Sequence, residues 1–501
     1  MDQSSITPNT SNQQLVINSD NDSATALLQE KQTRRRENLR DVTFKEYMTV
    51  GILCYVNLIN YMDRFTLAGV LRDVENEFDI GDDKAGFLQT VFVVAYMVFA
   101  PIFGYLGDRH SRRIIMAFGV ALWSFTTFFG SFLKHFGWFA VFRGLVGIGE
   151  ASYSTIAPTI ISDLFVGNIR SKMLAFFYFA IPVGSGLGYI VGSVAGAAAG
   201  NWRWGLRVTP FLGAVAVALI ALVMEDPERG QAEESHMKPT SYRDDLRALV
   251  RNPSFMLSTL AFTCVAFVTG ALAWWGPQFI YLGLTLQPGV DITLERVSLA
   301  FGGITMASGV VGVPLGAWLG AALVKRFPRA HPCICGAGLL LSAPAVTLAI
   351  LIAPYNFYAP FVLMFVGEIA LNLNWAIVAD MSLYVVVPPR RSTAEAFQIL
   401  ISHMFGDAGS PYLVGVISES LKHSLNTLPN EAPSQSIQFQ SLQYALFVTC
   451  FVEVIGGIFF LMTAMYIVKD KLKVDRAIAE AEAQHTEPSH SAAQEEIVAG
   501  E

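Results

Sequence analysis

Apolar stretches of about 20 to 30 residues recur along the chain from Tyr47 onward. An α-helix rises about 1.5 Å per residue, so each stretch can cross a hydrocarbon layer of about 30 Å. The stretches are continuously apolar, whereas the strands of a membrane barrel alternate over about ten residues, so the pattern predicts membrane helices. We expect twelve of them, at 47–71, 84–107, 114–134, 137–163, 173–198, 204–224, 254–283, 297–324, 333–354, 358–387, 395–421 and 440–468.

A polar, highly charged break separates the sixth apolar stretch from the seventh. It predicts an all-α polytopic membrane protein made of two six-helix halves joined by a linker. The expected organisation is an N-terminal arm, a first half, the linker, a second half and an acidic tail, at 1–46, 47–224, 225–253, 254–468 and 469–501. Pro101–Arg109 and Pro314–Arg326 end the second and eighth stretches in similar ways, which indicates a distant duplication and favours a transporter.

The composition agrees with a chain solvated mainly by lipid. Of 501 residues, 53% are hydrophobic and 15% are charged, whereas a soluble chain is about 25% charged. This argues against a soluble enzyme, and the net charge of −7 provides no basic surface for nucleic acid. The sequence contains no phosphate-binding loop, which argues against ATP-driven transport. It shows no cysteine pairing at metal-site spacing and no nucleophilic triad, so we expect no enzymatic activity, no metal and no cofactor.

Lys and Arg collect in the loops on one side of the predicted bundle, together with the basic N-terminal arm. The opposite side holds the acidic loop Arg72–Lys84, which has six acidic and two basic residues. Because cytoplasmic loops of membrane proteins are enriched in Lys and Arg, both termini are expected to be cytoplasmic.

One of these basic loops carries the best local motif, which runs from Gly104 through Asp108 and Arg109 to Arg112 and Arg113. It resembles the cytoplasmic loop between the second and third helices of major facilitator transporters. Glycines let the helix end approach a neighbour, and Asp108 can pair with an arginine or cap a helix, so we expect a latch that holds one conformation. The alternative is a basic loop that only orients the chain.

Ionisable residues inside the first-half helices are the strongest functional candidates, because each costs at least about 2.5–3.5 kcal/mol at a membrane centre. They are Asp63 and Arg64 in the first stretch and Arg143 and Glu150 in the fourth. Asp63 and Arg143 lie at similar depths, about 12 and 9 Å from the outer helix ends, so a cross-helix pair between them is feasible. The alternative is a structural salt bridge with no role in transport.

The second half has its own polar set within apolar stretches: Glu368, Asn372, Asn374, His403 and Asp407. Glu368 and His403 lie at similar depth, about 15 Å from their helix ends, and Asp407 follows His403 by one turn on the same face. These residues are expected to bind substrate, although a membrane histidine also serves as a packing residue. In the first half, our hypothesis is that Asp63 or Glu150 exchanges a proton when an anionic substrate competes for Arg143.

Taken together, the motifs resemble the spinster family of lysolipid and sphingolipid transporters within the major facilitator superfamily. The matching blocks lie at 60–66, 104–113, 143–158, 368–375 and 403–411. The resemblance implies alternating-access transport of lysophospholipids, sphingosine or sphingosine-1-phosphate, driven in some members by protons. It also implies that Asp63, Arg64, Arg143 and Glu150 form a charge network, and that Glu368 and His403 act on substrate or protons. We expect a monomer that binds lipid and no nucleic acid.

Two alternatives to this function stay open. A major facilitator protein could carry a small organic anion or a sugar, or a transporter-like protein could act as a receptor or scaffold that moves nothing. For location, the segment from Asp22 to Leu28 is similar to an acidic dileucine sorting signal, although its acid stands one residue too far from the leucines. The expected location is the late endosome or lysosome membrane, with the plasma membrane or another organelle as the alternative.

Overall fold

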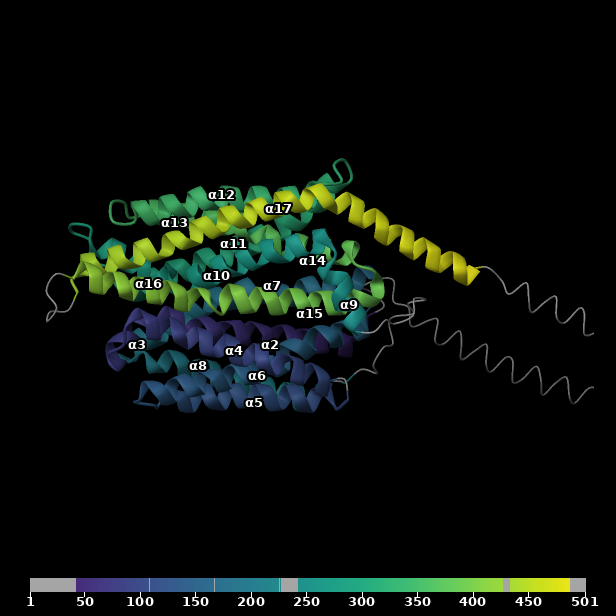
Figure 1. Ribbon diagram of the computed structural model, residues 1–501. Helices are drawn as coiled ribbons and strands as arrows, with labels where there is room; N and C mark the ends of the chain where they lie inside the picture. Colours follow the sequence, from purple (N-terminus) through teal and green to yellow (C-terminus); the bar gives the residue numbers. More distant parts are fainter. Residues whose placement is uncertain are drawn as a thin grey trace, which may run out of the picture.

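The computed structural model describes residues 42–107, 109–165, 167–224, 226, 242–426 and 433–486. The expected N-terminal arm with its dileucine segment, Asp108 and most of the linker therefore lie outside the described residues. The helices run side by side as one elongated bundle, with the first half on one side and the second half on the other (Figure 1).

The first half consists of six long helices and one short helix. The long helices are α2 (Phe44–Gly69), α4 (Asp82–Gly107), α5 (Arg112–Gly130), α6 (Phe136–Leu164), α7 (Gly167–Ala198) and α8 (Arg203–Leu222). Helix α2 begins with a capping box, in which Thr43 and Glu46 satisfy each other's backbone amides. The short helix α3 (Leu71–Phe78) follows it and ends at Asp79, whose φ of 50° is a left-handed helix cap.

The second half follows the short linker helix α9 (Tyr242–Val250). Helix α10 (Pro253–Thr285) begins where the Asn252 side chain accepts a hydrogen bond from the Phe255 amide, with proline at its first position. The remaining long elements are α11 (Leu294–Val324), α12 (Ala330–Ile352), α13 (Ala359–Asn372), α14 (Asn374–Val385), α15 (Arg391–Ser402), α16 (Ser410–Leu425) and α17 (Gln435–Thr486).

Nine stretches of helix among the described residues are long and apolar enough to cross a membrane. The predicted helices that this criterion leaves out are α2 and α6, which carry Asp63, Arg64, Arg143 and Glu150, and the pair α15–α16. Charged and polar side chains lower the hydropathy of α2 and α6, whereas α15 and α16 are each too short because η3 separates them, and all four lie within the same bundle (Figure 1).

One predicted helix is interrupted, which corrects the sequence-based prediction, and another has a local irregularity. The helix expected at 358–387 divides at Leu373 into α13 and α14, but Leu373 keeps helical backbone angles and Ala359–Ser382 still forms one span long enough to cross a membrane. The backbone at Leu373 packs directly onto α11. A Cβ atom added to Gly316 of α11 would lie only 2.4 Å from the Leu373 carbonyl oxygen. The helix expected at 395–421 contains a π-helical segment, η3 (His403–Asp407), in which Gly406 has non-helical backbone angles. π-Helical turns of this kind are frequent at functional sites.

Close helix crossings join the two halves. A Cβ added to Gly186 of α7 would lie 2.4 Å from the Gly302 oxygen of α11, and the reverse distance is also 2.4 Å. A Cβ on Gly86 of α4 would lie 2.3 Å from the Pro411 oxygen of α16. The helices pack closely at both crossings, because no side chain fits between these backbones.

The bundle has two ends, which we name after the short helices there, the α3 end and the α9 end (Figure 1). Several hydrogen bonds between the halves lie toward the α3 end. Ser298 donates to the Gly69 oxygen at 3.1 Å, and Tyr189 donates to the Ala273 oxygen at 2.6 Å. The Arg72 side chain of α3 donates to Gln438 of α17 at 2.6 Å. These bonds hold the halves together at this end.

Candidate functional site

An ion pair between α2 and α6 forms the centre of the first-half site. Arg64 Nη2 lies 3.0 Å from Glu150 Oε2, and the Glu150 side chain is fully buried. When the Asn60 amide is oriented to donate, its nitrogen lies 2.7 and 2.9 Å from the two Glu150 oxygens. The Arg64 guanidinium also lies 4.9 Å from the ring centre of Phe92 and 5.0 Å from that of Tyr61. These contacts neutralise and enclose a pair of charges that membrane burial would otherwise make costly.

The pair considered from depth, Asp63 with Arg143, does not form, and Arg64 rather than Asp63 carries the cross-helix ion pair. Asp63 is buried and accepts hydrogen bonds from the hydroxyls of Thr127 and Thr209. Its interaction with Arg143 is electrostatic and longer than an ion-pair contact. Counting residues along a helix gives the depth of a residue in the membrane but not the direction in which its side chain points. Asp63 and Arg64 have similar depths, but their side chains point in different directions.

Arg143 has unsatisfied hydrogen-bonding capacity. Its Nε and Nη2 atoms are buried without a hydrogen-bond partner, and its guanidinium lies 4.9 Å from the ring centre of Phe92. It borders a small cavity of about 10 Å³, shared with Thr127, which is about the volume that one water molecule needs. A buried guanidinium whose donors are not satisfied by protein groups is well suited to bind an anion.

Tyr96 connects the first-half network with the second half. Its ring centre lies 5.9 Å from the Arg64 guanidinium and 5.6 Å from the His403 ring, which meets it edge-on. His403 Nδ1 in turn lies 2.8 Å from Asp407 Oδ1, as their spacing predicted. The structure thus brings Arg64 and Glu150 of the first half close to His403 and Asp407 of the second half, with Tyr96 between them.

Glu368 stands in a separate cluster of hydroxyls on α11. Ser308 donates to its Oε2 at 2.6 Å and Thr305 to its Oε1 at 3.3 Å. Asn372 donates to Ser308 at 3.5 Å, whereas the buried Asn374 bonds to the Leu371 oxygen at the helix break. Glu368 and His403 form no hydrogen bond with each other in the described structure, so similar depth does not bring them into contact.

The sequence interpretation missed several polar residues that build the site. Tyr61 and Tyr96 enclose Arg64, and Thr127 and Thr209 hold Asp63. Hydroxyl residues in apolar helices are common, so sequence alone does not single these out. Glu453 of α17 is different, because a carboxylate within an apolar stretch is a visible signal. It is fully buried, and its Oε1 lies 3.0 Å from the Ser342 hydroxyl oxygen.

The basic loop motif forms contacts at the start of α5. Arg112 is buried and pairs with Asp163 near the end of α6, and its backbone amide donates to Asp226 at 3.1 Å. Arg113 donates to the Met224 oxygen at 3.5 Å, and Arg109 stacks on Tyr105 at 4.2 Å.

The expected role of the motif glycines needs a correction. Gly104 has no neighbour within 4 Å of an added Cβ, whereas at Gly107 that distance to the Ile156 side chain is 3.0 Å. Gly107, and not Gly104, is therefore where the helix end approaches its neighbour.

A second charged cluster joins the halves at the α3 end. Lys422 of α16 pairs with Asp82 at the start of α4, and Ser418 donates to the same carboxylate at 2.6 Å. Glu75 of α3 is buried beside them and accepts a hydrogen bond from Gln278 of α10 at 2.8 Å. Burial, reinforced by the negative charge of Asp82, raises the pKa of Glu75 well above its ordinary value, although Lys422 and Arg72 oppose this effect.

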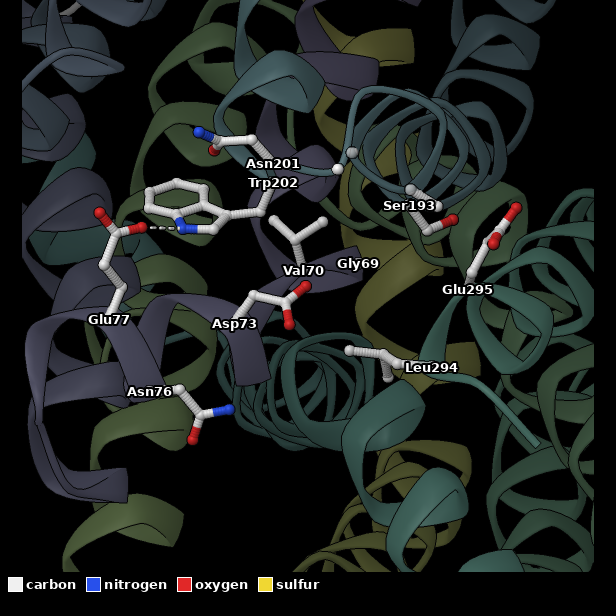
Figure 2. Close-up of a pocket in the computed structure, with 13 residues that line it drawn as sticks. Gly69, Val70, Asp73, Asn76, Glu77, Ser193, Asn201, Trp202, Leu294 and Glu295 are labelled. Atoms are coloured by element: carbon white, nitrogen blue, oxygen red, sulfur yellow. Dashed lines mark hydrogen bonds between the residues drawn. The ribbon is translucent and has the colours of Figure 1, made fainter. Parts of the chain in front are cut away.

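A cavity of about 560 Å³ also lies at the α3 end. Residues of α3, α7 and α11 line it, including Asp73 and Glu295, while Glu77 bonds to Trp202 Nε1 (Figure 2). None of the predicted site residues borders this cavity.

The sequence and the fold were compared with known proteins. The sequence model of the Major Facilitator Superfamily matches residues 53–411. A crystal structure described as a bacterial homolog of the human lysosomal transporter spinster, inward-facing and unoccupied, superposes with a TM-score of 0.74 at 21% identity, covering 85% of this chain and 98% of that one. The fold and the sequence match together define a multi-pass membrane transporter of the Major Facilitator Superfamily.

Proteins of similar sequence identify the family within this superfamily. Protein spinster of Drosophila melanogaster is 59% identical over 490 residues, which cover 89% of this chain and 81% of the relative. Protein spinster homolog 1 of Mus musculus is 53% identical over 437 residues, covering 85% of this chain and 81% of the relative. The chain belongs to the spinster family.

Proposed function

We propose that this transporter moves lysophospholipids or sphingolipids across a membrane by alternating access, with proton coupling. The observation that carries the proposal is the buried charge network, in which Arg64 is paired with Glu150 while Arg143 has two nitrogens without partners. A protein that only needed a structural tether would not leave a buried guanidinium unsatisfied, because that costs free energy.

The free donors of Arg143 are the proposed contact for an anionic headgroup. A guanidinium binds phosphate through two parallel hydrogen bonds, and the low dielectric of the bundle strengthens that contact. The aromatic rings of Tyr61, Tyr96 and Phe92 surround the neighbouring Arg64 and would contact the apolar part of an amphipathic ligand.

Proton coupling follows from competition within the same network. An anionic ligand that approaches the arginines competes with Glu150 for Arg64, and a carboxylate displaced from its partner takes up a proton. Asp63 is the second candidate carboxylate, since hydroxyls and not a cation hold it directly. The proton gradient is the proposed driving force, with no other cofactor.

In the second half, the proposed substrate-binding residues are Glu368, Asn372, Asn374, His403 and Asp407. The contact of His403 with Tyr96 supports this role, because substrate that reaches the network meets both halves there. The proposed latch is the loop motif of Gly104, Asp108, Arg109, Arg112 and Arg113, supported by the pairing of Arg112 with Asp163. The proposed form is a monomer in the late endosome or lysosome membrane. The lysosomal part of this proposal is supported by the description of the bacterial homolog, which calls its human counterpart a lysosomal transporter.

The test is transport by the purified full chain in liposomes, with and without a pH gradient. The panel contains lysophosphatidylcholine, sphingosine, sphingosine-1-phosphate, a sugar and a small organic anion, and protein-free liposomes are the control. We expect lipid transport that the pH gradient changes. Transport of only the sugar or the organic anion would contradict the lipid proposal, and binding of lipid without transport would indicate a receptor.

An Arg143→Gln variant tests the headgroup contact in the same assay. It should reduce transport of sphingosine-1-phosphate more than that of sphingosine, because only the former carries a phosphate. Equal reduction of both would contradict an anion-binding role for Arg143.

A further inference from the structure

Glu453 lies outside the network described above, in the packed interior of the second half. Its side chain is fully buried on α17, facing Ser342 of α12, whose side chain is also fully buried. Among the described residues, no lysine, arginine or histidine forms an ion pair with it. The titratable groups beside it are the thiols of Cys450, one turn earlier, and Cys264 of α10 near Gly456, and neither supplies a positive charge.

The hydroxyl of Ser342 lies between two acceptors. Ser342 Oγ is 3.0 Å from Glu453 Oε1 and 3.1 Å from the carbonyl oxygen of Gly367 on α13. A serine hydroxyl has one hydrogen, so it can donate to only one of them at a time, but its oxygen can also accept. If Glu453 were ionised, one of these two contacts would bring oxygen atoms together without a hydrogen between them.

The second carboxyl oxygen gives an independent indication. Glu453 Oε2 is buried without any hydrogen-bond partner. Burying an ionised carboxylate in a membrane interior costs much free energy when one oxygen shares a donor and the other has no hydrogen-bond partner. Burying the neutral acid costs far less. Both contacts of Ser342 are satisfied when Glu453 Oε1 carries a hydrogen and donates it to Ser342 Oγ, which donates its own to Gly367.

We propose that Glu453 is a proton-binding site that is occupied in this conformation, with the chain of donors running from Glu453 through Ser342 to the backbone of α13. Gly367 directly precedes Glu368, so the proton on Glu453 fixes the backbone of the segment that carries Glu368. This inference does not depend on which cargo the protein carries.

Infrared spectroscopy of the purified full chain in lipid tests the proposal, since protonated and ionised carboxyl groups absorb in separate bands. At neutral pH, Glu453→Gln should remove one protonated-carboxyl component, and Ser342→Ala should shift that component because the acid loses its acceptor. Glu368→Gln, as the control, should leave this component in place. The glutamine variant keeps a donor toward Ser342, so it should fold.

Two results would overturn the proposal. In one, Glu453→Gln removes an ionised-carboxylate component instead of a protonated one. In the other, Ser342→Ala leaves every protonated-carboxyl component unshifted, which also decides the question if the glutamine variant does not fold.

Discussion

Removing the positive charge of Lys422 should open the bundle at the α3 end. Lys422 pairs with Asp82 across the boundary between the halves, and their side chains are only 13% and 4% exposed. Substitution to methionine keeps the apolar stem and leaves Asp82 near Glu419 and Glu75 without the lysine that faces all three. The carboxylates of Asp82 and Glu419 then repel each other whenever the halves are joined at this end.

The size of the effect follows from the burial of the pair. Breaking a buried ion pair by removing one partner costs about 3–5 kcal/mol. Asp82 keeps the hydroxyl of Ser418 as a donor, so we take the lower limit of about 3 kcal/mol. Since about 1.4 kcal/mol changes an equilibrium tenfold, the ratio of joined to separated states should fall about a hundredfold. If the joined and separated states are populated at about 99 to 1 in the wild type, the two states would be almost equally populated in the variant.

Spin-label distance measurements would detect this change. Labels at Lys134→Cys in the first half and Tyr355→Cys in the second lie on exposed positions at the α3 end, in a background without the five native cysteines. Lys422→Met should add a longer-distance population. His423→Ala is the matched control, because that neighbouring side chain is 80% exposed. Our reasoning is refuted if Lys422→Met gives the wild-type distribution, or if both variants change it equally.

Two further predictions concern pH and packing. Because the joined form raises the pKa of Glu75 through burial and Asp82, it binds a proton more tightly than a form in which Glu75 meets water. Joining at the α3 end should therefore strengthen as the pH falls from neutral toward about 4.3, the ordinary pKa, and level off below it. Spin-label distances should lose this dependence in Glu75→Gln, and an unchanged dependence would contradict the assignment. For packing, Gly302→Ala should lower the melting temperature, because its Cβ would lie 2.4 Å from the Gly186 oxygen and overpacking costs about 1–3 kcal/mol. Gly303→Ala, which meets nothing within 4 Å, should not lower it, and equal effects would contradict this explanation.

Much of the helical framework follows from sequence, because the length of an apolar stretch and the thickness of a membrane together define a helix. The interruptions at Leu373 and Gly406 do not follow in the same way. The helix divides at Leu373, where the backbone packs onto Gly316 of α11. The other helix bends at Gly406, where the backbone meets Ala266 of α10. Such contacts depend on how distant segments meet, which hydropathy along one segment does not describe.

The sequence predicted which residues build the candidate site better than it predicted which of them contact each other. Buried charges are rare in apolar helices, which made Asp63, Arg64, Arg143 and Glu150 visible. Adjacent residues leave a helix about 100° apart, however, so only the packed structure decides that Arg64 and not Asp63 reaches Glu150. Tyr96, which connects the halves, carries no charge and had no comparable signal.

The most direct test of proton coupling through this network is lysolipid transport in liposomes, measured against pH for Asp63→Asn and Glu150→Gln beside the wild type. Both variants keep the shape of the side chain and remove its titration. We predict that at least one loses the response to a pH gradient while the protein still binds lipid. An unchanged pH response in both variants would contradict a coupling role for these carboxylates.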